Sequence, residues 1–581
     1  MKTSLHLLLE DYLGLMREEG ELDVYLPLLM SAKGHEIVYR AQKGPRQFGA
    51  DVVTVGRDAD GRKTLFIWLI KRGNLGRPDW DTGPQSIRQS MNEVGDTYLR
   101  THIAPQHVRL PKKLLVVTNG DFNQTLAQTF STYFPGWSAS NKMEVETVNG
   151  STLAIWTEHS LLDENILPPS SRALFRRMLA NVSTPELSID VGRQLFNELL
   201  AAAKAPAKSE PAQEKQRLVA VRGVRIALHV LEVWGQSEQN QLAAYRLAEY
   251  ALLCFWGGLH EEIAKNSKLA VEFGELSFQL TRIAEAYHEG MQAYYRTQDA
   301  LAYIRHDPLL VSETAFCELG RLGLQGCIWA FHAASADLPV ADAMAGVYMN
   351  RVIALLESHS CTQLPAYDRH SADIHVALLL LLIGRRMDSA RQWVDQMVQR
   401  LGPAAQSGKY WPLVARFEDA LAIRWGYQDM NDDFISTSTL LPILLLWTAV
   451  LGMTPAYRHL REVIVPAVPK TTLNFWSSDA GYDDAIADPR TLHEQGIGEA
   501  IASIPADPAD FLRTMAEPLR GTKSIETLAW YESRLVFLPL LAALHWGLQI
   551  PREMLVKHAV ALASDVVVDN ATPVSLRKRR E

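Results

Sequence analysis

One short stretch of the chain holds residues whose types and spacing suit metal-assisted chemistry. Residues 34–73 read GHEIVYRAQKGPRQFGADVVTVGRDADGRKTLFIWLIKRG, in which two apolar segments flank a turn rich in Asp and Gly. Such a pattern predicts a β-hairpin, with Asp51 entering its first strand and Lys71 ending its second. With the turn near residues 58–61, Asp51 falls opposite residues 68–69 and Lys71 lies diagonal to it.

This hairpin would bring a carboxylate and an ammonium group to one end of a two-stranded ribbon. Metal-assisted cleavage of a phosphodiester needs that pair, because carboxylates hold the ion between substrate and water while a lysine orients or deprotonates the water. We therefore expect a Mg²⁺ (or Mn²⁺) cofactor bound by Asp51, with Lys71 at the attacking water. Either residue alone is commonplace at a strand end, so the hypothesis rests on the combination.

The elements around the hairpin follow from hydrophobic periodicity. Strands are predicted at residues 35–40, 50–56, 63–72 and 113–118. Helices are predicted at residues 3–19, 21–33, 84–99 and 124–133. The helix at 84–99 has an apolar stripe of Ile87, Met91, Val94 and Tyr98. These helices must pack on the sheet and hold the hairpin in place.

This order of elements resembles the PD-(D/E)xK nuclease superfamily, and within it the Mrr-like restriction endonuclease branch. Residues 114–122 (LLVVTNGDF) and 145–154 (VETVNGSTLA) are similar to the later strand and turn motifs of that branch. The resemblance covers roughly residues 1–160. It implies an α/β domain at residues 1–165 with a restriction-endonuclease-like mixed sheet, flanking helices and metal-dependent cleavage of DNA.

The sequence departs from the superfamily at one position. The (D/E)xK motif places a carboxylate two residues before the lysine, where this chain has Leu69. Some members carry that carboxylate on the following helix, and here Gln89, Glu93 and Asp96 form a polar face on it. Glu93 is therefore the predicted second metal ligand. Glu21 resembles the additional helix-borne glutamate of the superfamily and is a further catalytic candidate.

Each of these acidic residues has a plainer explanation. A carboxylate on a helix face is by default exposed to solvent, and an acidic residue at a helix start suits the helix dipole. The alternative hypothesis is that Leu69 marks an inert nuclease-like domain. The chain would then be a nucleic-acid-binding or assembly subunit.

Basic and aromatic residues surround the predicted lysine. The candidates for nucleic-acid binding are Arg46, Arg72, Arg77, Trp80 and Arg88, since such side chains contact phosphates or stack on bases. A loop with a few surface charges and a buried tryptophan explains the same residues equally well. Because the net charge of the chain is −8, DNA binding would require a local basic surface of this kind.

The rest of the chain is predicted to be helical. Residues 166–216 are expected to be connecting helices and a linker, with residues 203–216 (AKAPAKSEPAQEKQ) as the clearest linker. Residues 217–572 are expected to be a large all-α domain, an irregular α-solenoid. The final residues, 573–581, contain RKRR and are expected to be a basic tail.

Two segments of the predicted helical domain have patterns of their own. Residues 374–401 loosely resemble a tetratricopeptide-type helical hairpin, with an apolar first helix and a Gly-Arg turn. Residues 471–492 carry four aspartates and are predicted to form an acidic loop.

Composition limits the remaining possibilities. The four cysteines contain no CxxC pair, which disfavours a disulfide framework or structural zinc site. The longest apolar runs fall short of a membrane span, so we expect a cytoplasmic protein without membrane contact. A nuclease joined to a helical module is similar to bacterial anti-phage or anti-plasmid defence effectors. By that analogy the helical domain would bind a protein partner or sensor, or a second copy of the chain.

Overall fold

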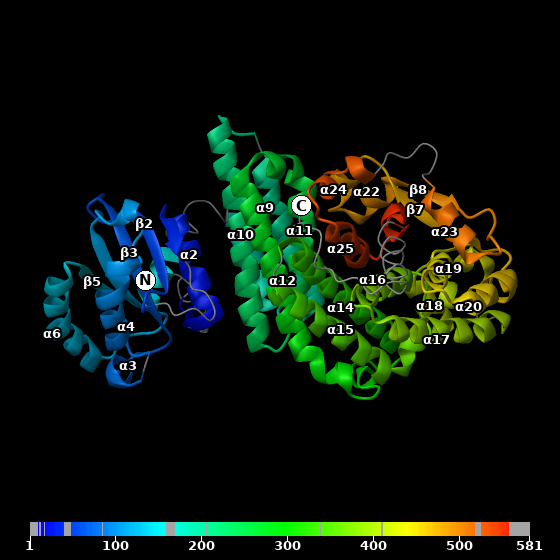
Figure 1. Ribbon diagram of the computed structural model, residues 1–581, viewed down its shortest axis with the longest axis horizontal. Coiled ribbons are helices and arrows are strands. Elements are labelled where there is room, and N and C mark those ends of the chain that lie inside the picture. The colour runs from blue at the N-terminus through cyan, green and yellow to red at the C-terminus, as the bar shows by residue number, and fades with distance from the viewer. Residues whose placement is uncertain are drawn as a thin grey trace, which may run out of the picture. The chain divides into compact units, whose positions relative to one another are not determined.

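The computed structural model describes residues 10, 13–14, 16, 18–39, 48–83, 85–157, 169–204, 206–336, 339–407, 411–517 and 525–556. The chain divides into two compact units, Met1–Ala243 and Ala244–Glu581. The first unit contains the mixed α/β domain, and the second is largely helical (Figure 1). Within the described residues, no helix is long and apolar enough to cross a membrane.

A five-stranded sheet forms the centre of the α/β domain, in the order β1-β2-β3-β4-β5. Its strands are β1 (Glu36–Tyr39), β2 (Val52–Arg57), β3 (Lys63–Lys71), β4 (Lys112–Thr118) and β5 (Glu144–Val148). The first three strands pair antiparallel, whereas β3, β4 and β5 pair parallel. The α/β domain with a mixed sheet is thus confirmed, and the four predicted strands lie within a few residues of their predicted bounds.

The directions of the strands place Asp51, Lys71 and Asn119 at the same edge of this sheet. Parallel strands place their carboxyl ends together, so the residues that follow β3, β4 and β5 share an edge. Because β2 runs antiparallel to β3, that edge also receives the beginning of β2, where Asp51 lies. Lys71 ends β3 at the same edge, and Asn119 comes directly after β4.

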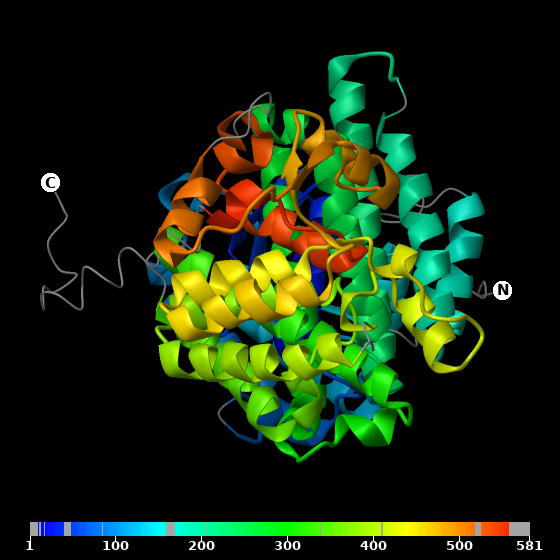
Figure 2. The ribbon, with the colours of Figure 1, turned by 90° about the vertical axis from the view of Figure 1, so that its right-hand side faces the viewer.

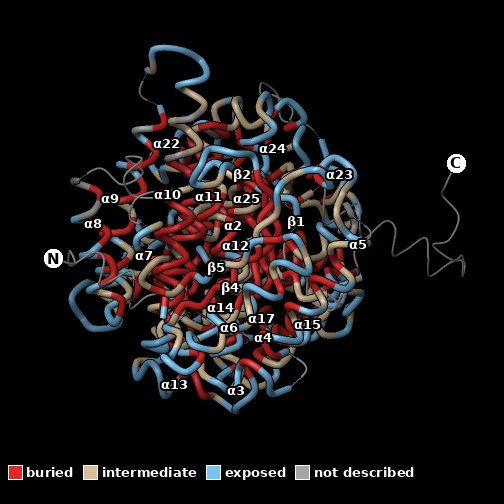
Figure 3. The backbone as a smooth tube through the Cα atoms, turned by 90° about the vertical axis from the view of Figure 1, so that its left-hand side faces the viewer, coloured by how far each residue is buried: buried red, intermediate tan, exposed pale blue. Residues whose placement is uncertain are grey.

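Helices cover both faces of the sheet. On one face, Leu65, Ile67 and Leu69 of β3 join a buried core with apolar residues of α4 (Ile87–Glu93) and α6 (Gln124–Asn141). On the other face, Trp68 contacts Trp156 of α7 (Gly150–Thr157) edge-on. The alternation of side chains along β3 therefore fills two cores, and β3 is buried along nearly its whole length. Figure 3 colours the backbone by burial, with buried residues in red.

Shorter elements complete this domain. They are η1 (Glu18–Leu22), α2 (Asp23–Ala32), α3 (Arg77–Asp81), η2 (Val94–Tyr98), α5 (Leu99–Thr101) and η3 (Pro105–His107). The element η1 is a single π-helical turn that leads into α2. The predicted helix at 84–99 is therefore α4, a π-turn and α5 in succession.

Three helices follow the α/β domain within the first unit: α8 (Pro169–Ala180), α9 (Pro185–Lys204) and α10 (Glu210–Ser237). They pack against one another, and α9 and α10 are joined only by residues 205–209. Gln213 of α10 donates from Nε2 to Ala203 O at 2.9 Å and accepts from Ala207 N–H at 2.8 Å. The predicted linker at 203–216 is therefore wrong: it is the turn of a helical hairpin, and the units divide after Ala243 instead.

The second unit begins within α11 and consists mainly of helices (Figure 2). Its long helices are α11 (Leu242–Lys265), α12 (Ser267–Arg296), α14 (Pro308–Ala336), α15 (Pro339–Ser358), α16 (His370–Ile383) and α17 (Met387–Gln406). Its other α-helices are α13 (Leu301–Ile304), α18 (Phe417–Arg424), α19 (Leu440–Val450), α20 (Thr454–His459), α21 (Tyr482–Ala485), α22 (Pro489–Glu494), α23 (Pro508–Ala516), α24 (Ala529–Glu532) and α25 (Phe537–Trp546). Single turns are η5 (Ser360–Gln363), η6 (Trp411–Leu413), η7 (Asp432–Ile435), η8 (Leu460–Ile464), η9 (Val465–Ala467) and η10 (Ile525–Thr527).

Helix α14 is central to this unit and packs against both α15 and α16. Two of its glycines allow the close approach of α16, since a Cβ on Gly323 would lie 2.8 Å from Ala377 N and one on Gly326 would lie 2.3 Å from Leu380 Cδ2. Helices α16 and α17 form the hairpin predicted at 374–401, with Arg385 in the left-handed region at φ 56° in the turn.

A three-stranded sheet interrupts the helices of the second unit, and the sequence did not predict it. The strands are β6 (Thr437–Ser438), β7 (Thr472–Ser478) and β8 (Gly496–Ala500), in that order. The predicted acidic loop at 471–492 is therefore wrong, because these residues form β7, α21 and α22. Asp488 accepts from Arg490 N–H at the start of α22, and Asp483 is buried.

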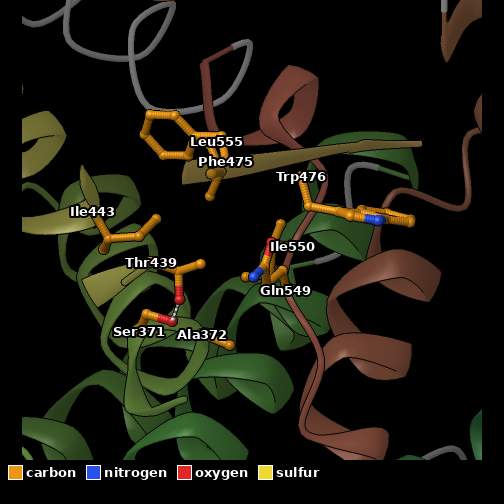
Figure 4. A pocket seen from close by; sticks show the side chains of 9 residues that line it. All are labelled: Ser371, Ala372, Thr439, Ile443, Phe475, Trp476, Gln549, Ile550 and Leu555. Carbon is orange, nitrogen blue, oxygen red and sulfur yellow. Dashed lines mark hydrogen bonds between the residues drawn. The ribbon is translucent and has the colours of Figure 1, made fainter. Parts of the chain in front are cut away.

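Beside β7 lies a small cavity of about 10 Å³, which is room for one water molecule (Figure 4). Its polar lining includes Ser371, whose hydroxyl lies 3.0 Å from that of Thr439, and Gln549. Thr439 donates its own proton to Asp368, which also accepts from the backbone N–H of Thr439 and of Leu440. The cavity thus adjoins the buried start of α19 and is too small for an organic ligand.

Asp483 provides a test of this packing. Its carboxylate accepts from Trp256 Nε1 at 2.7 Å, Ala529 N at 2.7 Å and Trp530 N at 3.2 Å. Asp483→Ala would leave these buried donors unpaired, so we expect the free energy of unfolding to fall by about 3 kcal/mol. Asp484→Ala is the matched control, since the Asp484 side chain is 80% exposed. Equal thermal midpoints for the two variants would contradict the buried position of Asp483.

Candidate active site at the sheet edge

Asp51 is held at the sheet edge by the backbone of the neighbouring strand. Its N–H donates to Trp68 O at 3.0 Å, and its Oδ2 accepts from Ile70 N–H at 2.7 Å. Extending the β2–β3 register by one residue places Asp51 opposite Leu69, as the hairpin pattern predicted. The side chain is partly buried, and its carboxylate is fixed next to the end of β3.

Lys71 meets a carboxylate that the sequence prediction missed. Its Nζ lies 3.3 Å from Oε1 of Glu18, which belongs to η1. The Lys71 side chain is 14% exposed and that of Glu18 is 37% exposed, so both groups remain within reach of solvent. The sheet edge therefore brings together Asp51, which directly precedes β2, Lys71 from β3 and Glu18 from η1.

The electrostatics of Asp51 reflect these neighbours. Burial raises the pKa of Asp51 to about 6. The Ile70 N–H and the Lys71 ammonium lower this pKa, whereas the charges of Glu18 and Asp23 raise it. A carboxyl with a raised pKa beside an ammonium and other carboxylates is a common property of functional sites.

The two acidic residues that the sequence favoured are placed differently. Glu93 is the last residue of α4 and is partly buried, but the strongest charge effects on Asp51 come from Lys71, Glu18 and Asp23. Glu21 belongs to η1, and its side chain lies outside the described residues. Glu18 is the carboxylate whose contact with the site is defined by a distance.

A π-turn explains why the helical pattern did not single out Glu18. The sequence EEGEL at residues 18–22 offers three glutamates, and a regular α-helix would place positions 18 and 21 on one face. A π-turn adds an extra residue to the turn and so shifts the helical phase. No pattern of apolar residues marks this shift in the sequence.

Leu69 is fully buried in the core on the α4 side of the sheet. The same core contains Val53 of β2 and Met91 of α4. A carboxylate at position 69 would therefore be buried among apolar side chains at high cost. Leu69→Glu should unfold the domain rather than restore a ligand, and the strand itself cannot supply the second carboxylate of the superfamily motif.

The predicted nucleic-acid contacts divide into two groups. Arg72, Arg77 and Arg88 are exposed, and the Arg88 guanidinium lies over the ring of Tyr133 at 5.6 Å from its centroid. Trp80 is wrong as a stacking residue, because it is only 4% exposed and packs edge-on against Tyr133 and Phe130. Arg46 lies outside the described residues.

The donor set at the edge suits a hard divalent cation. Carboxylate oxygens are the ligands that Mg²⁺ and Mn²⁺ prefer, and Mg²⁺ is often held by one or two carboxylates together with water and phosphate oxygens. Asp51 and Glu18 can supply such a pair. Within the part of the chain that the structure describes, no three His, Cys, Asp or Glu side chains are grouped to hold an ion by themselves.

No protein-family model, curated protein or solved structure matches this chain.

The raised pKa of Asp51 predicts how the stability of the folded protein changes with pH. In the folded state Asp51 binds its proton with a pKa of about 6, above the usual unfolded value near 4, so its charge opposes folding at pH 7 and above. This cost disappears as pH falls through 6 towards 4. Asp51→Asn keeps an oxygen for the Ile70 N–H and removes the charge. We expect this variant to melt about 5 °C above the wild type at pH 8.

The same comparison at pH 4.5 should show a much smaller difference, because wild-type Asp51 is then largely protonated. Thermal midpoints followed by circular dichroism at both pH values measure this. A difference in thermal midpoint that does not change with pH would show that Asp51 is not the group with the raised pKa.

Proposed function

We propose that the α/β domain is a divalent-metal-dependent nuclease that hydrolyses phosphodiester bonds in DNA. The observation that carries the proposal is the meeting of Asp51, Lys71 and Glu18 at one sheet edge, with Lys71 Nζ 3.3 Å from Glu18. Two carboxylates and one ammonium group on a partly solvated edge are the groups that metal-assisted phosphodiester hydrolysis uses.

Each side chain has a role that follows from its position. Asp51 and Glu18 would hold the cation, which when bound would polarise the phosphate and lower the pKa of a water molecule. The Ile70 N–H fixes the Asp51 carboxylate through Oδ2, which leaves Oδ1 for the ion. The side-chain nitrogen of Lys71 lies 3.3 Å from Glu18 and can donate to a phosphate oxygen or to water. Exposed Arg72, Arg77 and Arg88 are available to bind the DNA backbone.

A specific observation supports the alternative of an inert nuclease-like domain. Leu69 occupies the usual position of the strand carboxylate and is fully buried. If Glu18 does not serve as a metal ligand, the edge retains one carboxylate from the superfamily motif and its lysine. The domain would then bind nucleic acid or a partner protein without cleaving a substrate.

Cleavage by the full chain tests the proposal. Purified protein would be incubated with plasmid, linear duplex, single-stranded DNA or RNA, with Mg²⁺, Mn²⁺ or EDTA. We expect metal-dependent cleavage of DNA that Asp51→Asn and Lys71→Met each reduce by about 100-fold or more, because each removes a group that contacts the reacting atoms. Glu18→Gln should reduce it by about 10- to 100-fold through weaker metal binding.

Two further variants test which glutamate is needed for cleavage. Glu19→Gln changes the exposed neighbour of Glu18 and should leave cleavage within about two-fold of the wild type. Glu93→Gln tests the residue that the sequence favoured and should also retain activity. Loss of activity in Glu93→Gln with retention in Glu18→Gln would reverse the assignment. Wild-type protein that neither cleaves a substrate nor binds Mn²⁺ would establish the inert alternative.

A further inference from the structure

Asn119, the residue that follows β4, makes a three-way connection at the sheet edge. Its Oδ1 accepts from Gly73 N–H at 2.7 Å, and its Nδ2 donates to Leu13 O at 2.6 Å and to Met16 O at 2.8 Å. The side chain is 3% exposed. Because the two carbonyls can only accept and the Gly73 N–H can only donate, the contacts themselves fix which way the amide faces.

Two glycines, Gly120 and Gly150, allow the backbone segments around Asn119 to pack very close to one another. A Cβ on Gly120 would lie 2.4 Å from the carbonyl carbon of Gly73, and one on Gly150 would lie 2.3 Å from Asn119 O. Gly150 N–H also donates to Gly120 O at 2.9 Å. The turns after β3, β4 and β5 are thus packed together. This packing fixes the position of the Asn119 backbone, from which its side chain extends.

The connected atoms lie close in sequence to the site residues. Met16 precedes Glu18 by two residues, and Gly73 follows Lys71 by two residues. One amide group therefore joins the segment that carries Glu18 to the end of the strand that carries Lys71. The carbonyls of Leu13 and Met16 are thus both bonded to one side chain at the end of β4.

We propose that Asn119 is a positioning residue for the candidate site: its amide holds the Glu18 segment over the sheet edge, so that Glu18 reaches Lys71 and Asp51. The role given to Glu18 rests on the proposed nuclease function. The position of the segment that carries Glu18 is independent of that function. The experiment therefore has one arm without metal and one arm with it.

The metal-free arm uses hydrogen exchange of the full-length protein. Asn119→Ala removes both donors and the acceptor, and should speed amide exchange in peptides covering residues 18–22 by about ten-fold or more, since that segment loses its attachment. Asn123→Ala is the matched control. It removes an asparagine of the same turn whose Oδ1 accepts from Leu126 N at 2.8 Å as the cap of α6. This control should speed exchange in α6 and not in residues 18–22.

Unchanged exchange at residues 18–22 in Asn119→Ala would overturn the positioning role. If that variant does not fold, Asn119→Ser replaces it, because a hydroxyl is too short to bridge both carbonyls and should give the same local increase in exchange.

The metal arm measures Mn²⁺ affinity by calorimetry in a double-mutant cycle. Asn119→Ala should weaken Mn²⁺ binding by about 10-fold in the wild-type background and have no further effect in Glu18→Gln, because both changes remove the same ligand. Equal losses in the two backgrounds would overturn the proposal by showing a general structural effect. No Mn²⁺ binding by the wild type would refute the proposed nuclease function, and hydrogen exchange would then decide the role of Asn119 alone.

Discussion

The direction of β2 relative to the three parallel strands is the constraint on which the candidate site depends. Were β2 parallel to β3, Asp51 would lie at the far edge of the sheet from Lys71. The antiparallel pairing instead sets Asp51 opposite Leu69, two residues from the lysine, and the Ile70 N–H fixes its carboxylate at 2.7 Å. The parallel pairing of β3 with β4 then brings Asn119 to the same edge.

The buried carboxylate of Glu318, in the second unit, contrasts with that of Asp51. Although burial alone would raise the pKa of Glu318, the Arg321 guanidinium, His288 and hydrogen bonds from two tyrosines hold it below its ordinary value. Those donors, Tyr287 and Tyr295, each lie 2.7 Å from the Glu318 carboxylate. Such a network stabilises the helical core and engages both carboxylate oxygens of Glu318 with donors of the protein. Asp51 has one backbone donor, a raised pKa and a partly solvated position, which suits a group that binds a cation.

The pattern of apolar residues carried enough information to predict β1 to β4 as strands, and β2, β3 and β4 lie close to their expected bounds. The same reasoning placed Asp51 and Lys71 at one end of the hairpin. It failed where position depends on contacts distant in sequence. The sequence suggested that Trp80 stacks on bases, but this side chain packs on Phe130 and Tyr133. The sequence also suggested that Asp483 lies in a loop, but its carboxylate accepts from three donors that are distant in sequence. The 203–216 segment was misjudged because composition does not show that Gln213 closes a turn between two helices.

The buried position of Leu69 determines where a second carboxylate can come from. The strand faces the α4 core at that position, so a charge there would require a rebuilt core. A ligand from another element must approach the edge from its solvated side, and Glu18 of η1 does so. Leu13 and Met16, which precede η1, are hydrogen-bonded to the end of β4 through the Asn119 amide. Under the proposed positioning role of Asn119, the second carboxylate of the site would depend on this local attachment, which could open without unfolding the sheet that carries Asp51 and Lys71.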